Sequence, residues 1–348
     1  MGILGGKRKI KSNSALVIAA GCAVAFMFIA TIISIVIYKQ RMEKAGELMA
    51  EAKYQQYDSY VVMISSDDDS DFWKQVYESA KEVGAENGIY VDMLSQSVDK
   101  TYSKLELIEM AIATDCDAIF VEGDDSPETA AALQKANRAG IAVFTLSSDV
   151  EIDNRTSYIG SNPYSIASLY ANSLVGNLTN QKKVMVLGGN TISINTANAF
   201  VNNIQTAMTT MELPNGPLEF DVRTVESTDA FATEEYVQNL FKENDLAPIV
   251  ICLDGESTAS FYQAMIDYNK VGQIMLLGTN KSTTVLTGIK QHVITSTVFV
   301  DPAAIGKAAA EAYIELQEAG YVSEYISVEA SVIDASNVAD ELQEVENE

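Results

Sequence analysis

Residues 104–146 read KLELIEMAIATDCDAIFVEGDDSPETAAALQKANRAGIAVFTL, and this stretch decides the fold. Its first apolar residues recur at helical spacing, and a run of β-branched and aromatic residues follows at 118–122. Pro127 suits the first turn of a second helix, and Gly140 suits the end of that helix, before another apolar run at 142–146. Helix, strand, helix and strand in this order predict βαβ units and a mainly parallel sheet.

The same alternation continues over the rest of the chain from residue 60. Two series of strands are predicted: 60–64, 89–94, 118–122, 142–146 and 157–160, then 183–188, 219–226, 248–253, 273–278, 294–300 and 327–333. Segments of helical period separate most of these strands. With 348 residues the chain is long enough for two α/β lobes, each with its own core.

A long apolar segment, Ala15 to Tyr38, contains no charged side chain. As a helix it would be about 36 Å long, which is enough to cross a hydrocarbon core of about 30 Å. Basic residues precede it without any acid, whereas both signs are mixed after it. We therefore expect a cytoplasmic basic tail (1–14), a single-pass transmembrane anchor (15–38) and an extracytoplasmic domain in the cell membrane of a bacterium. Cleavage as a signal peptide and lipidation at Cys22 stay open as alternatives.

The remaining composition narrows the function class. Residues 39–57, rich in Ala, Glu and Lys, predict a helical stalk, and the acidic segment 335–348 predicts a solvated tail. With 23 basic and 48 acidic residues the net charge is −25, which argues against nucleic acid as a partner. The three cysteines lie far apart, so neither a disulfide framework nor a zinc site is indicated.

Four phrases stand at corresponding places in the predicted βαβ order. SDFW (70–73) follows the first strand, ATDCDAIFV (113–121) and ANRAGIAV (136–143) lead into the third and fourth, and YIGSN (158–162) runs through the fifth strand and out of it. In this order they resemble the type I periplasmic sugar-binding proteins, whose core is shared with the ligand domains of lactose-repressor-type regulators. The resemblance covers roughly residues 58 to 333, nearly all of the predicted folded region.

The resemblance implies two doubly wound parallel-sheet lobes joined by three crossover strands. The lobes would be 58–160 plus 301–322 and 161–300 plus 323–334, with the ligand captured between them. A regulator of this core would need a DNA-binding headpiece where this chain has its apolar segment. We therefore expect a solute receptor that closes by hinge motion and serves an ABC-type permease. A ligand-sensing subunit of a membrane sensor kinase and an envelope interaction protein without ligand binding stay open.

The candidate site follows from the position of ligands in open α/β sheets, which bind beyond the carboxyl ends of the strands. Matching to the sugar-binding pattern selects polar and aromatic residues, with Val300 as a further position: Ser70, Phe72, Trp73, Glu122, Ser147, Ser148, Ser161, Thr196, Asp254 and Asn280. Aromatic rings lie against the apolar face of a sugar, and carboxylates and amides bind its hydroxyl groups.

Several of these positions depart from the family pattern. Ser147-Ser148 replaces an Asp-Arg pair, Thr196 replaces an arginine and Asn280 replaces an aspartate. Without arginine the site lacks bidentate donors, and with Glu122 and Asp254 it is acidic. We therefore expect a neutral sugar or polyol, or a cationic ligand, rather than an anion.

Some candidates suit a structural role equally well. Phe72 and Trp73 also fit a buried helix face, and Glu122 and Asp254 also fit helix caps, so both roles stay open. The acidic run 67–69 lacks the spacing of a calcium loop, and we expect no metal site there. The single histidine has no nucleophile motif beside it, so we expect neither an enzyme nor a cofactor.

Overall fold

The computed structural model describes residues 57–347, apart from 69, 99–101, 125, 151–152, 154, 214–215, 228 and 230, together with Met27 and Thr31. The predicted basic tail, anchor and stalk therefore lie outside the described residues, except for those two positions and Tyr57. Among the residues that the structure describes, no helix has the length and apolar character needed to cross a membrane.

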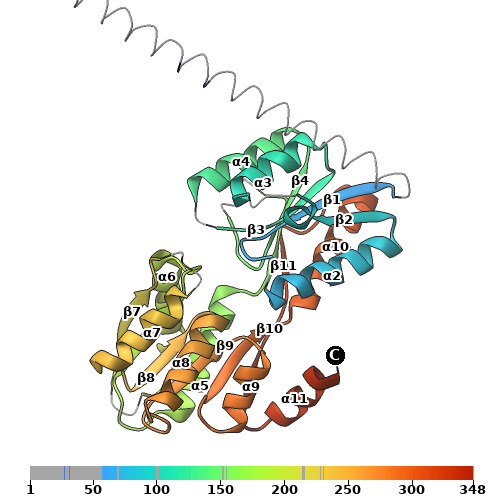
Figure 1. Ribbon diagram of the computed structural model, residues 1–348. Helices are drawn as coiled ribbons and strands as arrows, with labels where there is room; N and C mark the ends of the chain where they lie inside the picture. The colour runs from blue at the N-terminus through green and yellow to red at the C-terminus, as the bar shows by residue number, and fades with distance from the viewer. Residues whose placement is uncertain are drawn as a thin grey trace, which may run out of the picture. The chain divides into compact units, whose positions relative to one another are not determined.

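The first of two six-stranded sheets has the order β11-β5-β4-β3-β1-β2 (Figure 1). Its strands are β1 (Ser59–Ile64), β2 (Ile89–Met93), β3 (Ala118–Glu122), β4 (Ala142–Leu146), β5 (Ser157–Gly160) and β11 (Tyr325–Ser327). The accompanying helices are α2 (Asp71–Glu86), η2 (Leu94–Ser97), α3 (Lys104–Ala113), α4 (Pro127–Arg138) and α10 (Pro302–Ala319). Strand β1 pairs in parallel with β2 on one side and β3 on the other, so the direction of winding reverses between β1 and β3.

The second sheet repeats this plan, with the order β12-β10-β9-β8-β6-β7. Its strands are β6 (Lys183–Gly188), β7 (Glu219–Thr224), β8 (Ile249–Cys252), β9 (Met275–Thr279), β10 (Ser296–Val300) and β12 (Ala330–Asp334). Its helices are α5 (Pro163–Asn177), α6 (Ile194–Met208), α7 (Ala232–Glu243), α8 (Gly255–Asp267), α9 (Thr283–Lys290) and α11 (Val338–Asn347). Winding reverses between β6 and β8, and only the edge strand β12 of this sheet runs antiparallel to its neighbour.

The prediction of two doubly wound α/β sheets is confirmed, with one change at the C-terminal end. A single strand was expected at 327–333, but β11 ends the first sheet and β12 ends the second. The chain leaves β11 at Val328, whose N–H donates to Gly160 O at 3.1 Å. The sequence of the predicted strand 327–333 does not indicate where the chain passes from the first sheet to the second.

Packing divides the described chain into two compact units. One comprises the residues up to Ser157 together with Ala310–Val322, and the other comprises Tyr158–Ala309 together with the residues from Ser323 onward. The division falls within β5, between Ser157 and Tyr158, so it does not coincide with a strand boundary. Each unit has its own buried core.

In the first unit, alternate residues of the strands bury opposite faces of the sheet. Val62 of β1 and Ile119 of β3 are fully buried in one cluster with the inward stripes of α3 and α4. Phe120 and Phe144, also fully buried, meet edge to face at 5.5 Å between ring centroids, and Phe144 packs in the same way against Tyr313 of α10. Helices therefore cover both faces, and the strand interiors are mainly apolar; among the buried exceptions, Asp92 of β2 and Thr145 of β4 are hydrogen-bonded.

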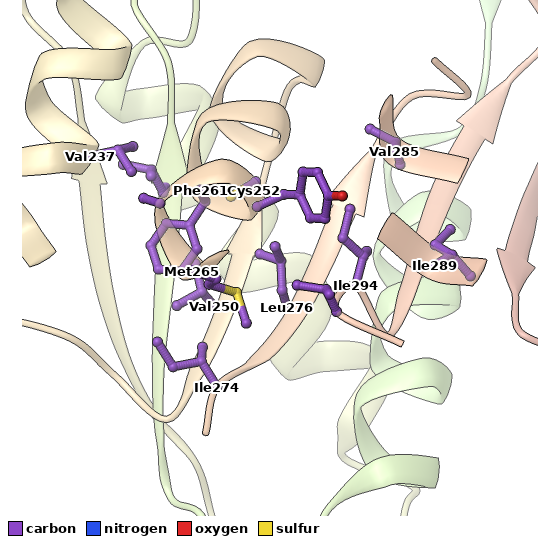
Figure 2. Packing of buried hydrophobic residues seen from close by; sticks show 14 of the residues in the cluster. Val237, Val250, Cys252, Phe261, Met265, Ile274, Leu276, Val285, Ile289 and Ile294 are labelled. Carbon is purple, nitrogen blue, oxygen red and sulfur yellow. The ribbon is translucent and has the colours of Figure 1, made fainter. Parts of the chain in front are cut away.

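The second unit follows the same rule. Val184 and Val186 of β6 pack against α5 and α6, whereas the intervening Met185 and Leu187 pack on the other side against α7, α8 and α9. Figure 2 shows this second cluster, in which Phe261 of α8 lies among aliphatic side chains of the sheet and of the neighbouring helices. With both faces of the central strands filled, their ends are the parts left for polar side chains exposed to solvent.

The prediction of a solvated tail at 335–348 is wrong, because most of that segment is the helix α11. Val338 and Leu342 lie one turn apart and are buried, at 4% and 8% exposure, in the cluster that contains the inward face of α9. Val345 continues the stripe as a partly buried residue. The sequence analysis overlooked this spacing of four and three residues because acidic residues surround it.

Replacing Leu342 by Ala tests the docking of α11. A buried leucine lost from a packed cluster should lower the free energy of unfolding by about 2 kcal/mol, measured by chemical denaturation followed by circular dichroism. The exposed neighbour Gln343 serves as the control, and Gln343→Ala should stay within about 0.5 kcal/mol of the wild type. Equal stability of the two variants would mean that the helix is solvated after all.

Candidate functional site

The acid that ends β3 bridges to the loop that follows β1. Glu122 accepts a hydrogen bond at 2.8 Å from the backbone N–H of Ser66 to its Oε2. These residues stand at the carboxyl ends of the two strands between which the winding of the first sheet reverses. Such a reversal leaves a crevice at the carboxyl edge, because the loops on either side of it run in opposite directions.

The second sheet has the same arrangement at the corresponding place. Asp254, which follows β8, accepts from the backbone N–H of Gly189, which follows β6, with 2.6 Å between N and Oδ2. Its other oxygen accepts from Ser257 N at 2.8 Å and so caps α8. Of the two roles left open for this residue from the sequence, the structure shows the helix cap, through Oδ1, and adds the bridge to Gly189, through Oδ2; contact with a ligand stays a prediction.

A second pair of equivalent positions follows β4 and β9. Ser147 has φ = 64° and Asn280 has φ = 90°, and each is the first residue after its strand. Non-glycine residues in this region of φ carry a backbone strain of roughly 1–3 kcal/mol, and such residues concentrate at binding sites. The sequence analysis selected both residues from the family pattern but had no signal for their backbone conformation.

Glycine allows the ends of β3 and β4 to approach closely. Gly123 N donates to Ser148 O at 3.1 Å, and a Cβ at position 123 would lie 2.4 Å from that same oxygen. In the second unit, a Cβ on Gly255 would lie 2.6 Å from Nδ2 of Asn280. The Asn280 amide therefore lies against Gly255, the first residue of α8, whose N-cap is Asp254.

The sequence analysis missed an arginine near the end of β4. Arg155 pairs with both carboxylate oxygens of Asp149, at 2.6 Å from Nε and 2.9 Å from the second amino group, and its side chain is only 7% exposed. Thr145 Oγ1 donates to the same carboxylate at 2.8 Å. The opposite charges of positions 149 and 155 in one short loop were the available signal, but a match to family positions did not include them.

A lysine at the start of α3 also reaches this edge of the first sheet. Lys104 Nζ lies 2.6 Å from Asp124 Oδ2 and donates to Glu122 O at 3.1 Å, with 15% of its side chain exposed. Together with Arg155, it shows that basic groups are present near the strand ends of the first unit but are bound to carboxylates. Family matching did not select Lys104 either.

The predicted residues of the first helix have distinct environments. Ser70 is the N-cap of α2, accepting from Trp73 N at 3.3 Å and donating to Asp67 O at 2.8 Å. Trp73 is 5% exposed and begins the buried stripe of α2, whereas Phe72 is half-buried. The two rings meet edge to face, with 5.3 Å between centroids.

Two further candidates lie apart from these clusters. Ser161 is buried, and its Oγ donates to Val328 O, so it ties two connecting segments of the second unit together. Thr196 is exposed in the first turn of α6, where its N–H donates to the N-cap Ser193 at 3.1 Å. Val300 ends β10 opposite Ala330 of β12.

These groups are suited to binding rather than to covalent chemistry. The thiols of Cys116 and Cys252 are buried, and burial raises the pKa of Cys116 to about 12, so it is not a thiolate at neutral pH. Within the described part of the chain, no three His, Cys, Asp or Glu side chains gather in a way that could hold a metal ion. The fold and the polar strand ends define the class of α/β solute-binding proteins.

The chain belongs to the periplasmic binding protein family, since residues 60–320 match the model described as "Periplasmic binding protein domain". Its fold is that of the type I sugar-binding members, as the resemblance in the sequence implied. No curated protein sequence matched the chain.

Solved structures share this fold at low sequence identity. A glucose-galactose binding protein named GanP from Geobacillus stearothermophilus has a TM-score of 0.69 at 16% identity, covering 80% of this chain and 98% of its own. A solute-binding protein of an ABC transporter from Clostridium phytofermentas, with bound L-rhamnose, has a TM-score of 0.70 at 16% identity, covering 82% and 98%. A complex described as XylFII-LytSN gives 0.67 at 17% identity, covering 80% and 98%.

Trp73, the single tryptophan of the chain, permits a test of its predicted place in the site. Because it is buried on the packed face of α2, Trp73→Ala should lower the free energy of unfolding by about 3–5 kcal/mol, followed by circular dichroism. Phe72→Ala, at the half-buried neighbour, should cost clearly less. A Trp73→Ala protein with wild-type stability would instead mark a side chain that packs against ligand rather than against the core.

Proposed function

We propose that this protein is an extracytoplasmic solute receptor that binds a small neutral or cationic polar ligand, with a sugar or polyol favoured, at the carboxyl ends of its strands. The strongest support is the hydrogen bond from Ser66 N to Glu122 and its counterpart from Gly189 N to Asp254. Each fixes an acid at the point where winding reverses, which is where open α/β sheets bind ligands.

Both acids retain capacity for a ligand. A carboxylate has about four acceptor positions, and the bonds from Ser66 to Glu122 and from Gly189 and Ser257 to Asp254 use only some of them. The remaining lone pairs suit the hydroxyl groups of a sugar or the N–H groups of a cation.

The pairing of the nearby basic groups argues against an anionic ligand. Lys104 is bound to Asp124, Arg155 to Asp149, and Lys281, which follows Asn280, to Glu341 and Glu344. An anion would have to displace these internal carboxylates to gain a strong partner. The sugars named with the GanP and Clostridium phytofermentas structures agree with a neutral ligand for this chain as well.

The partner proposed for the receptor is an ABC-type permease, in keeping with the transporter named for one fold neighbour. A receptor that passes a signal to another protein is the second candidate, and the neighbour found in the XylFII-LytSN complex favours it. Both partners would act on the ligand-bound form.

A thermal-shift panel with a matched pair of variants tests the proposed ligand class. The full-length chain in mild detergent is mixed with D-glucose, D-galactose, D-xylose, L-rhamnose, myo-inositol, spermidine, D-glucuronate and glucose 6-phosphate. A neutral sugar, polyol or polyamine at 100 times its Kd should stabilise the protein by about 2.7 kcal/mol, whereas the two anions should not. Stabilisation by the anions alone would contradict the acidic site, and no response to any compound would favour a protein that has lost ligand binding.

The matched variants are Asp254→Asn and Asp245→Asn, at opposite ends of β8. Asp254→Asn should abolish most of the ligand-induced shift, while the asparagine still caps α8. Asp245→Asn, at the amino end, should keep the full shift although it loses the pair with Arg223. Equal shifts in both variants would remove Asp254 from the site.

We also propose that the folded domain lies outside the cell, held by the apolar segment 15–38, as the distribution of basic residues predicts. Protease added to intact cells without their wall should then cut within residues 39–57 and release the folded domain, detected by an antibody to its C-terminal end. A cytoplasmic enzyme followed in the same cells is the control. Protection of the domain would reverse the predicted orientation.

A further inference from the structure

The C-terminal helix α11 holds the turn that carries a predicted ligand-binding residue. Apolar residues anchor the helix in the core beside α9, as Val338 and Leu342 are both buried there. Its polar side meets Lys281, the second residue after β9, through Glu341 and Glu344. The last element of the chain is thereby connected to the carboxyl end of the second sheet.

Lys281 is fixed by three groups. Its Nζ lies 2.7 Å from Glu341 Oε2 and 2.5 Å from Glu344 Oε2, and 5.3 Å from the centroid of the Phe299 ring. Only 15% of the side chain is exposed. Burial acts to lower the pKa of Lys281, but the hydrogen bonds and charges of Glu341 and Glu344 outweigh it and raise that pKa, so the side chain stays charged at neutral pH.

The backbone of Lys281 in turn holds Asn280. The Lys281 N–H donates to Oδ1 of Asn280, while Asn280 N donates to Val298 O at 3.1 Å and Asn280 O accepts from Thr297 Oγ1 at 2.8 Å. These bonds maintain the positive φ of Asn280 and direct Nδ2 toward Gly255 at the start of α8. A strained residue persists only where its surroundings enforce it.

We propose that Lys281 is a positioning residue, through which Glu341 and Glu344 of α11 hold Asn280 in its strained conformation beside the start of α8. Releasing the lysine side chain frees the β9–α9 turn, so the Asn280 amide loses its fixed direction. The helix α11 thereby sets the ligand affinity of the second unit. This consequence for affinity rests on the proposed function, whereas the hold on the turn does not.

Amide hydrogen exchange in the ligand-free, full-length chain tests the hold on the turn. Lys281→Met and the double variant Glu341→Gln/Glu344→Gln should accelerate exchange of the Lys281 amide and its neighbours in the turn roughly tenfold, because charge-assisted bonds that keep the turn closed are lost. Lys281→Arg, which keeps the charge and gains a fork of donors, should restore slow exchange. Arg223→Met serves as the control, since it removes ion pairs to Asp221 and Asp245 in the same unit. Unchanged exchange in the first two variants would overturn the role of Lys281.

Affinity for the neutral panel compounds, D-glucose, D-galactose, D-xylose, L-rhamnose and myo-inositol, tests the consequence. For any of these that binds the wild type, Kd should rise roughly tenfold in Lys281→Met and return to the wild-type value in Lys281→Arg, with Arg223→Met unchanged. Faster exchange with an unchanged Kd would overturn the link between the helix and the ligand. If none of the five binds the wild type, the proposed sugar ligand fails, while the exchange measurement still decides whether α11 holds the turn.

Discussion

The burial of both faces of each parallel sheet is the constraint on which the rest of this structure depends. Strands such as β6 send alternate residues into two different helix layers, so a polar side chain inside a strand costs free energy unless it is hydrogen-bonded within the protein, as Asp92 of β2 is by the Tyr60 hydroxyl. Polar side chains that could meet a ligand are thereby left mainly to the ends of the strands. At the carboxyl ends, the two places where winding reverses are each bridged by an acid that accepts a backbone N–H.

The two units use equivalent devices with different residues. Glutamate in the first and aspartate in the second occupy the same place in the topology, and serine and asparagine occupy the next place with positive φ. The aspartate also caps a helix, so one carboxylate orients both a loop and a helix start. Groups held by several bonds are preorganised, which reduces the entropy lost when a ligand binds.

Near these strand ends, the basic side chains are paired with acidic ones. Lys104, Arg155 and Lys281 each have carboxylates as partners, and none of the three side chains is more than 15% exposed. The sequence indicated a site that disfavours anions, because the family's arginines are replaced and Glu122 and Asp254 are acidic, but it did not show that basic groups lie close by and are already paired. Lys281 adds a connection that no linear pattern displays, because its partners lie more than fifty residues further along the chain.

The sequence by itself determined most of the strands, their βαβ order and the strand ends as the place for polar groups, because alternating periods and apolar runs depend on local chemistry and burial. The doubly wound plan was what the family resemblance implied. Glu122, Ser147, Asp254 and Asn280 were selected in this way together with the family pattern. Only the tertiary structure decided that β11 and β12 belong to different sheets, that 338–347 is a packed helix, and that Arg155 pairs with Asp149. These features depend on which distant segments pack together. The local sequence of a strand, an acidic helix or a charged loop is the same whichever distant segment it contacts. Contacts between distant residues are fixed by the packing of the whole core, so they could not be read from any one stretch of the chain.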